Sequence, residues 1–216
     1  MTEKQKMATW QESQPTGAGS REVLAKDIEA AQAGDPQSQY QLGFKYYLGA
    51  TGAQDFNEAA RWYAAAAEQG HAEAQYKLAK MKSQGIGLDV EHEAALKWFL
   101  AAGEQGHAEA LFSIGELYAQ GHGVEADARE AYRWLYLAWR RFDADLAAYL
   151  LGEGLDASVR GAALAAALGD AELAADLEIG LEKAQSALDQ QRAALDAASV
   201  PGIEDEAQGW LTARSL

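Results

Sequence analysis

The heptapeptide EQGHAEA occurs twice in the chain, first as Glu68–Ala74 and again as Glu104–Ala110. The two copies are offset by 36 residues. Identity over seven residues at a fixed spacing is typical of an array of stacked structural units. The repeat therefore predicts a surface built from similar units side by side. Such a surface favours a binding role over catalysis in a deep pocket.

Three units of this length align without gaps, at residues 34–69, 70–105 and 106–141. Each begins with a glycine, which suits the left-handed backbone after a helix end, and continues with a residue in an N-cap position. An aromatic and an aliphatic residue follow, then a glycine-containing loop, and then a tryptophan in the second half. The repeated positions are Gly34, Gly70 and Gly106; Asp35, His71 and His107; Tyr40, Tyr76 and Phe112; Leu42, Leu78 and Ile114; Gly49, Gly85 and Gly121; and Trp62, Trp98 and Trp134.

Each unit is predicted to be a helix–loop–helix hairpin. Because one hairpin cannot bury its own apolar face, neighbouring hairpins must stack. The tryptophan of each second helix is expected to be the apolar anchor between the paired helices, and Gly43 and Gly115 are expected to let those helices approach closely. We expect first helices near 35–47, 71–83 and 107–119, and second helices near 55–68, 91–104 and 127–140.

At this level of detail the pattern resembles the Sel-one-like repeat (SLR), a relative of the tetratricopeptide repeat. The first unit departs from the pattern in its loop, at Gly49–Ala53, and the second has Lys82 where the family usually shows tyrosine. The resemblance covers residues 34–141 and implies an all-α fold. The implied architecture is a right-handed α-solenoid (an alpha-alpha superhelix) whose first helices line a concave face. The third unit carries the resemblance best, through Ala108-Glu109-Ala110, Ile114-Gly115-Glu116-Leu117-Tyr118, Gly121-His122-Gly123-Val124, Asp127, Ala131 and Trp134.

The segments on either side of the repeats are predicted to cap the array. Residues 1–19 are interpreted as a disordered polar tail and residues 20–33 as an N-terminal capping helix, with Ser20 as the N-cap of a helix from Arg21 to Ala33. Residues 142–199 are predicted to hold a partial repeat and C-terminal capping helices, whereas 200–216 are expected to be a loose acidic tail. The alternative is that the C-terminal helices contact a partner or a second copy of the chain. The helices expected in 142–199 lie near 143–151, 158–168 and 171–198.

The chain has 216 residues, no cysteine and a net charge of −15, of which residues 142–216 account for −10. This charge argues against nucleic-acid binding, which needs a basic surface. It favours either simple solvation or the attraction of a basic partner. The lack of cysteine excludes disulfides and thiolate metal sites. Without a signal-like N-terminus or an apolar run of about 18 residues, we expect a cytoplasmic protein with no membrane insertion.

No catalytic or metal constellation is predicted, so we expect a non-enzymatic protein without a cofactor. His71 and His107 occupy equivalent caps on helices about 10 Å apart, which is too far for them to share a zinc ion. The run Glu91-His92-Glu93 places its side chains in different directions on a helix, and an acidic first turn is ordinary. Some proteins of the SLR type have been proposed to hydrolyse β-lactams. Those proteins are rich in disulfides, and this chain lacks cysteine.

The resemblance to tetratricopeptide-like hairpins implies that one set of first-helix positions faces the groove. Its aromatic members would form a ladder with a large contact area and few bonds to immobilise. The alternative is that these aromatic residues are partly core, packed between successive hairpins. The predicted partner-binding residues are Gln37, Tyr40, Phe44 and Tyr47, then Glu73, Tyr76, Lys80 and Ser83, and finally Glu109, Phe112 and Glu116, with Ala119 at the last equivalent position.

The leading hypothesis is a protein–protein interaction scaffold or adaptor that binds a peptide or a protein surface in this groove. The SLR resemblance also allows an immunity protein that neutralises a bacterial toxin or secreted effector. The negative charge favours a basic target for either role. A third hypothesis is a structural homodimer built through the C-terminal helices. The chain is expected to be a monomer or a weak homodimer through the C-terminal helices.

Overall fold

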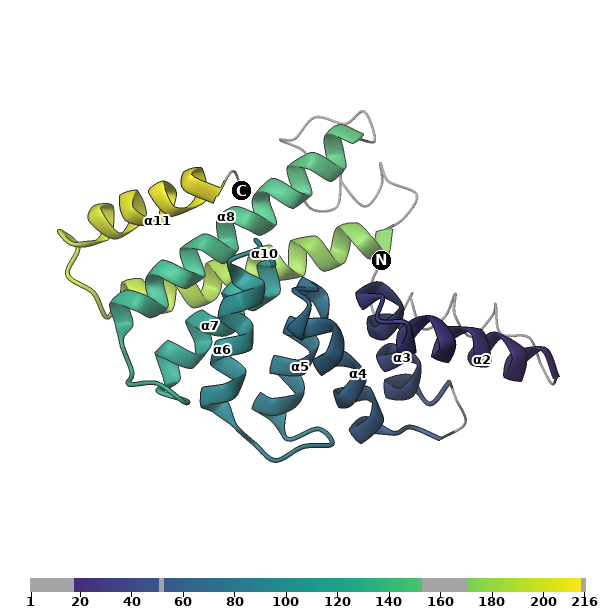
Figure 1. The fold of residues 1–216 in the computed structure, drawn as a ribbon. Coiled ribbons are helices and arrows are strands. Elements are labelled where there is room, and N and C mark those ends of the chain that lie inside the picture. Colours follow the sequence, from purple (N-terminus) through teal and green to yellow (C-terminus); the bar gives the residue numbers. More distant parts are fainter. Residues whose placement is uncertain (1–17, 51–52, 153–170, 215–216) are drawn as a thin grey trace. The chain divides into compact units, whose positions relative to one another are not determined.

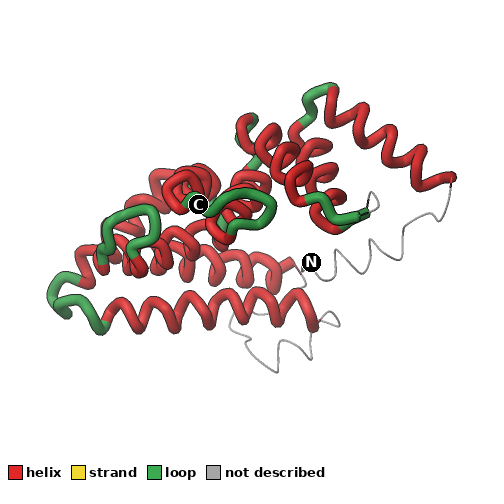
Figure 2. Tube along the Cα trace, turned by 90° about the horizontal axis from the view of Figure 1, so that it is seen from below, coloured by secondary structure: helices red, strands yellow, loops and turns green. Residues whose placement is uncertain are grey.

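The computed structural model describes residues 18–50, 53–152 and 171–214, which form helices, turns and loops without any strand (Figures 1 and 2). The chain divides into two compact units, with the boundary along the sequence between His107 and Ala108. No described helix is both long and apolar enough to cross a membrane. The helices are α2 (Ala18–Gln32), α3 (Pro36–Leu48), α4 (Phe56–Glu68), α5 (Ala72–Gln84) and α6 (His92–Gly103) in the N-terminal unit, and α7 (Ala108–Gln120), α8 (Ala128–Gly152), α10 (Ala171–Arg192) and α11 (Val200–Arg214) in the C-terminal unit.

The repeats are hairpins of paired helices, as predicted, and the first helices begin one residue later than expected. Gly34, Gly70 and Gly106 all have positive φ angles, of 95°, 87° and 82°, in the turns that precede the first helices. Only glycine adopts this conformation without strain. The residue after this glycine caps the helix: the Asp35 carboxylate accepts from the Ser38 N–H at 2.7 Å, and the His71 ring does the equivalent.

The core anchor of each second helix is the residue after the expected tryptophan. Tyr63, Phe99 and Leu135 are only 1–3% exposed, and each packs inside its own hairpin. Trp62 and Trp98 are half-buried, and Trp98 packs on the edge of a cluster that includes Tyr63. The prediction that the tryptophans anchor the hairpins is therefore wrong for these two positions. One residue is 100° of helix rotation, which is enough to turn a side chain from the centre of an interface to its rim.

The close approach of paired helices depends on small residues of the first helix. A Cβ added at Gly43 would lie 2.9 Å from the Tyr63 ring, and one added at Gly115 would lie 2.6 Å from Leu135 Cγ. Both contacts are closer than real Cβ atoms make, which confirms the role predicted for these two glycines.

The C-terminal unit departs from the repeat pattern inside α8. We expected a break near residue 141 and a new first helix over 143–151, but α8 runs without interruption from Ala128 to Gly152. The chain has Phe142 where the earlier units have the turn glycine. Its ring is 7% exposed and packs against Gly180 of α10, where an added Cβ would lie 2.9 Å from the ring. Without a residue suited to the left-handed turn, the helix continues.

The C-terminal segment forms a helix, so the prediction of a loose tail after residue 200 is wrong. α10 ends at Arg192 instead of continuing to 198, and after a short turn α11 packs on α8. Val200, Ile203, Ala207 and Leu211 are all buried, which is the spacing of one apolar helix face. Two polar contacts also join α11 to α8, because Tyr132 Oη donates to Glu204 at 2.6 Å and Arg129 forms a bidentate pair with Glu206.

The helix that precedes the first repeat, α2, starts two residues before Ser20, so Ser20 lies within it and does not cap it. α2 packs on α3 through an ion pair between Asp27 and Lys45 and a hydrogen bond from Gln39 Nε2 to the Ala31 carbonyl at 3.1 Å. The tail predicted at 1–19 falls almost wholly outside the described residues, as does the helix predicted at 158–168.

Candidate functional site

In the N-terminal unit, the histidine that precedes a first helix contacts predicted groove residues of the repeat before it. The His71 ring stacks on Tyr40, with 4.8 Å between ring centroids. His71 Nε2 lies 2.9 Å from Gln37 Oε1, and His71 Nδ1 accepts from the Ala74 N–H at 3.2 Å. These contacts require the neutral ring with its proton on Nε2. One side chain thus caps α5 and holds it against α3.

The same arrangement occurs one repeat later. The His107 ring stacks on Tyr76 at 4.5 Å, and its Nε2 lies 3.0 Å from Glu73 Oε2. Glu73 also faces Lys77, with 3.6 Å between Oε1 and Nζ. Four of the predicted groove residues, at positions 37, 40, 73 and 76, therefore make contacts between repeats. Tyr40 and Tyr76 are half-buried by them, in the way that the alternative interpretation of partly core aromatic residues describes.

The environment of His71 favours its neutral form. Partial burial lowers the pKa of His71 below its ordinary value of 6.5, and the nearby Glu73 carboxylate opposes that effect. The lone pair on Nδ1 is occupied by the Ala74 N–H, so a proton added there would remove the cap. His71 is therefore a structural group whose cap is present when the ring is neutral.

A second set of repeated polar contacts was not predicted from the sequence. Gln39 and Gln75 are buried, and Gln75 Nε2 donates to the Ala67 carbonyl at 3.1 Å, as Gln39 does to Ala31. Each buried amide also accepts a hydrogen bond at 2.7 Å from the glutamine at the end of the following second helix, Gln69 or Gln105. The recurrence of glutamine at a spacing of 36 residues could have indicated these buried amides. We did not interpret it so, because glutamine is common on the exposed surfaces of helices.

The remaining predicted residues of this unit, Phe44, Tyr47, Lys80 and Ser83, are also half-buried. Phe44 stacks on Tyr40 at 6.4 Å, and Tyr47 packs edge-on against Phe56 at 5.2 Å. Lys80 Nζ lies 6.0 Å from the centre of the Tyr76 ring. Ser83 turns back to donate to the Lys80 carbonyl at 3.0 Å, so its hydroxyl is engaged within its own helix.

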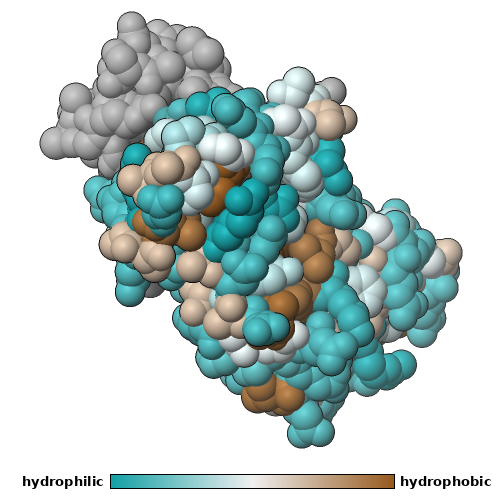
Figure 3. Space-filling view, turned by 90° about the vertical axis from the view of Figure 1, so that its left-hand side faces the viewer, coloured by the Kyte–Doolittle hydropathy of each residue, from teal (hydrophilic) through white to brown (hydrophobic). Residues whose placement is uncertain are grey.

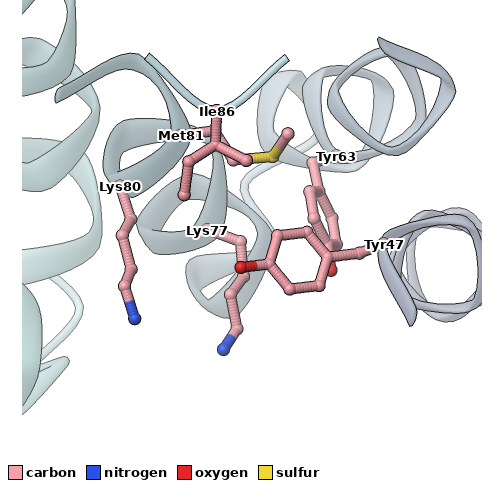
Figure 4. A pocket seen from close by; sticks show the side chains of 6 residues that line it. All are labelled: Tyr47, Tyr63, Lys77, Lys80, Met81 and Ile86. Carbon is pink, nitrogen blue, oxygen red and sulfur yellow. The ribbon is translucent and has the colours of Figure 1, made fainter. Parts of the chain in front are cut away.

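A small pocket opens on this face (Figure 4). The Lys77 and Lys80 side chains run side by side and end in ammonium groups at the same edge, and the Tyr47 ring lies next to Lys77. The enclosed space is about 10 Å³, which is roughly the room needed by one water molecule. The pocket is too small for a metabolite. It is lined by Tyr47, Tyr63, Lys77, Lys80, Met81 and Ile86.

The predicted groove residues of the third repeat lie in the C-terminal unit and have a different environment. Phe112 packs against a buried cluster that includes Leu188 of α10. Glu116 lies near Lys183 of α10, and the two charges attract. Glu109 is exposed. In this repeat α10 thus neighbours the first-helix face that a partner was expected to occupy.

The described residues contain no group of three or more histidine, aspartate or glutamate side chains that could hold a metal ion. His71 and His107 each make the structural contacts given above. The side chains of this surface make ring stacks, hydrogen bonds and ion pairs.

The fold is an all-α helical-repeat solenoid, and its repeats identify the family. The Sel1 repeat model matches residues 36–71, 72–107 and 108–139. A Sel1 repeat protein from Oxalobacter formigenes is 30% identical, with a TM-score of 0.50; the match covers 55% of this chain and 90% of that protein. The chain belongs to the Sel1 repeat family, whose members are commonly non-catalytic scaffolds for protein–protein interaction.

A second solved structure is similar over a longer stretch. It is c5321, described as a protective antigen of uropathogenic Escherichia coli with an SLR fold, and it is 25% identical with a TM-score of 0.54. The match covers 74% of this chain and 33% of c5321, so the chain spans about a third of that protein's length. Among curated proteins, none matches the chain.

Proposed function

We propose that this chain is a non-enzymatic adaptor that binds a segment of another protein along α3 and α5 of its N-terminal unit. The aromatic residues Phe44 and Tyr47 supply apolar contact area on this face, and Lys80 supplies charge. Aromatic side chains of this kind, with few rotatable bonds, are favoured in protein interfaces.

The proposal rests on the lack of an ion pair at Lys80 within the described part of the chain. In this unit the ammonium groups of Lys45, Lys77, Lys82 and Lys97 all face carboxylates of the same chain. Among the described residues, Lys80 forms no ion pair with a carboxylate, and its amine stands at the edge of the pocket, with Lys77 between it and Tyr47. In a chain with a net charge of −15, a lysine without a carboxylate partner is a suitable anchor for an acidic residue of a partner.

A partner of this chain is expected to make both apolar and polar contacts. Figure 3 shows another side of the molecule, the left-hand side of Figure 1, where hydrophobic residues form small patches between hydrophilic ones. Among the described residues, the large hydrophobic side chains that stand out as exposed are Val90, at 56%, and Ile179, at 45%. From the aromatic contacts of Phe44 and Tyr47 and the position of Lys80, we expect a partner that places an apolar side chain against Phe44 and Tyr47 and an acidic group near Lys80.

Site-specific photo-crosslinking in cells tests this proposal. A photoreactive amino acid at position 80 is expected to capture one protein reproducibly, in competition with excess unmodified chain. The same amino acid at Lys97, which is 73% exposed on α6, serves as the control. Equal capture from both positions, or none from position 80, would refute binding on this face.

A further inference from the structure

The C-terminal unit contains a second surface feature, an open groove between α8 and α10. The two helices lie side by side in Figure 1 and run antiparallel, because Leu135 packs near Leu188 whereas Phe142 packs on Gly180. The groove has a volume of about 470 Å³, within the range of sites that hold a ligand group. It is lined by Trp139, Leu181, Glu182, Gln185, Ser186 and Asp189.

The lining combines an indole and a leucine with two carboxylates, and it contains no basic side chain. Elsewhere in this unit the indoles have a cation from the chain itself: Arg133 lies 4.6 Å from the Trp134 ring centre, and Arg214 lies 4.1 Å from that of Trp210. Within the described residues, Trp139 contacts the Tyr136 ring but has no cation over its own. Its indole is therefore available to a cation from outside the chain.

The two carboxylates of the groove are also available. Glu182 and Asp189 are exposed, and neither forms an ion pair with any part of the chain that the structure describes. Gln185 donates to Asp189 at 3.0 Å, which orients that carboxylate without neutralising it. The two acids are seven residues apart, so they lie on the same side of α10 and about 10 Å apart along its axis.

We propose that this groove docks a basic helical segment of another protein. Two lysines or arginines seven residues apart on that helix have the spacing of Glu182 and Asp189. Their aliphatic stems would pack on Trp139 and Leu181 while their charged ends reach the carboxylates. This arrangement is charge-complementary and resembles the flanking ion pairs of a helix bundle. The groove belongs to the C-terminal unit, whereas α3 and α5 belong to the N-terminal unit, and its partner is basic where the partner proposed for α3 and α5 carries an acidic group.

Fluorescence anisotropy with the full chain and a model peptide tests the proposal. The probe is a labelled amphipathic helical peptide of about 18 residues, with leucines on one face and two lysines seven residues apart. A counterpart with glutamates at those two positions is the ligand control. The protein variant Glu182→Gln with Asp189→Asn removes both carboxylates. Its matched control is Glu125→Gln with Asp205→Asn, which removes two exposed charges elsewhere in the same unit.

The lysine peptide is expected to bind, and the glutamate peptide is expected to bind about tenfold or more weakly. The groove variant should bind the lysine peptide about fivefold more weakly than the wild type, as expected for the loss of two exposed ion pairs. The control variant should change this affinity by less than about twofold. Trp139→Ala should lower the affinity for the lysine peptide about tenfold and leave the circular dichroism spectrum unchanged. Equal binding of both peptides, equal effects of both double variants, or no binding would overturn the proposal. So would a homodimer in light scattering that the groove variant dissociates, because a second copy would then occupy the groove.

Discussion

Removal of the His71 ring should weaken the N-terminal unit by an amount that can be divided among its contacts. Loss of the cap on Ala74 costs about 1 kcal/mol. Loss of the stack on Tyr40 costs about 0.5–1.5 kcal/mol, and loss of the hydrogen bond to Gln37 about 0.5 kcal/mol. His71→Ala is therefore expected to lower the free energy of unfolding by about 2–3 kcal/mol.

A second variant separates the cap from the ring contacts. His71→Asp restores a cap of the type that Asp35 makes in the first repeat, at 2.7 Å to the Ser38 N–H, but it has no ring to stack on Tyr40. We expect this variant to lose only about 1–2 kcal/mol, since the cap contribution is retained.

Amide hydrogen exchange is the appropriate assay, because a chain with two compact units need not unfold in one transition. Exchange at the Ala74 amide should accelerate in His71→Ala and stay protected in His71→Asp. The Ser38 amide, capped by Asp35, is the internal control in both variants. The reasoning is refuted if His71→Ala leaves Ala74 protected, or if His71→Asp is as damaging as His71→Ala.

Three further predictions concern other positions. Burial lowers the pKa of His71 in the folded chain, so the unfolded chain binds the proton of this residue more tightly. The contribution of the neutral His71 ring to stability is therefore complete above about pH 6.5 and is lost as the pH falls through the folded-state pKa. The urea midpoint of the N-terminal unit should fall on acidification, and it should fall less in His71→Asp. Gly115→Ala should destabilise the C-terminal unit by about 1–3 kcal/mol, whereas Gly209→Ala, at an open position in α11, should stabilise it by about 0.5–1 kcal/mol; similar melting shifts would refute the close packing of α7 on α8. In denaturant titrations Phe99→Ala should lower the free energy of unfolding by about 3–5 kcal/mol, and Trp98→Ala by about half as much. A larger loss for Trp98→Ala would show that the tryptophan, and not Phe99, anchors the hairpin.

The repeat itself was the most predictable part of the fold. A period of 36 residues, a turn glycine and a cap residue are local signals, because each depends on the backbone conformation of one or two residues. They placed the first helices to within one residue. The rotation of the second helices was less certain, since Trp98 and Phe99 are both large and apolar. Only packing against α5 decides which of the two is buried.

The C-terminal unit was harder to predict, because several repeat signals disappear there together. Leu111, Arg141 and Phe142 stand where the earlier repeats have a buried glutamine, its glutamine partner and the turn glycine. Without that hydrogen-bonded turn, α8 continues through the expected boundary. The helical character of α11 was visible in the spacing of Ile203, Ala207 and Leu211, but its three consecutive acidic residues suggested a solvated tail.

The candidate site could be predicted only in outline. The face that carries Tyr40, Phe44 and Lys80 followed from the resemblance to tetratricopeptide-like hairpins. The contacts of Gln37 with His71 and of Glu73 with His107 span 34 residues, and no local pattern indicates them. The groove beside Trp139 was missed because it depends on α8 remaining straight and on where α10 lies against it.

The most direct test of the proposed function is a calorimetric titration of the purified partner captured from position 80. Lys80→Glu is expected to weaken that complex about tenfold or more while leaving the circular dichroism spectrum unchanged, because Lys80 stands at the pocket edge and not in the core. Lys97→Glu, with the same change of charge on α6, should alter the affinity less than about twofold. Equal affinities for wild type and Lys80→Glu, or equal losses in both variants, would contradict recognition on the face of α3 and α5.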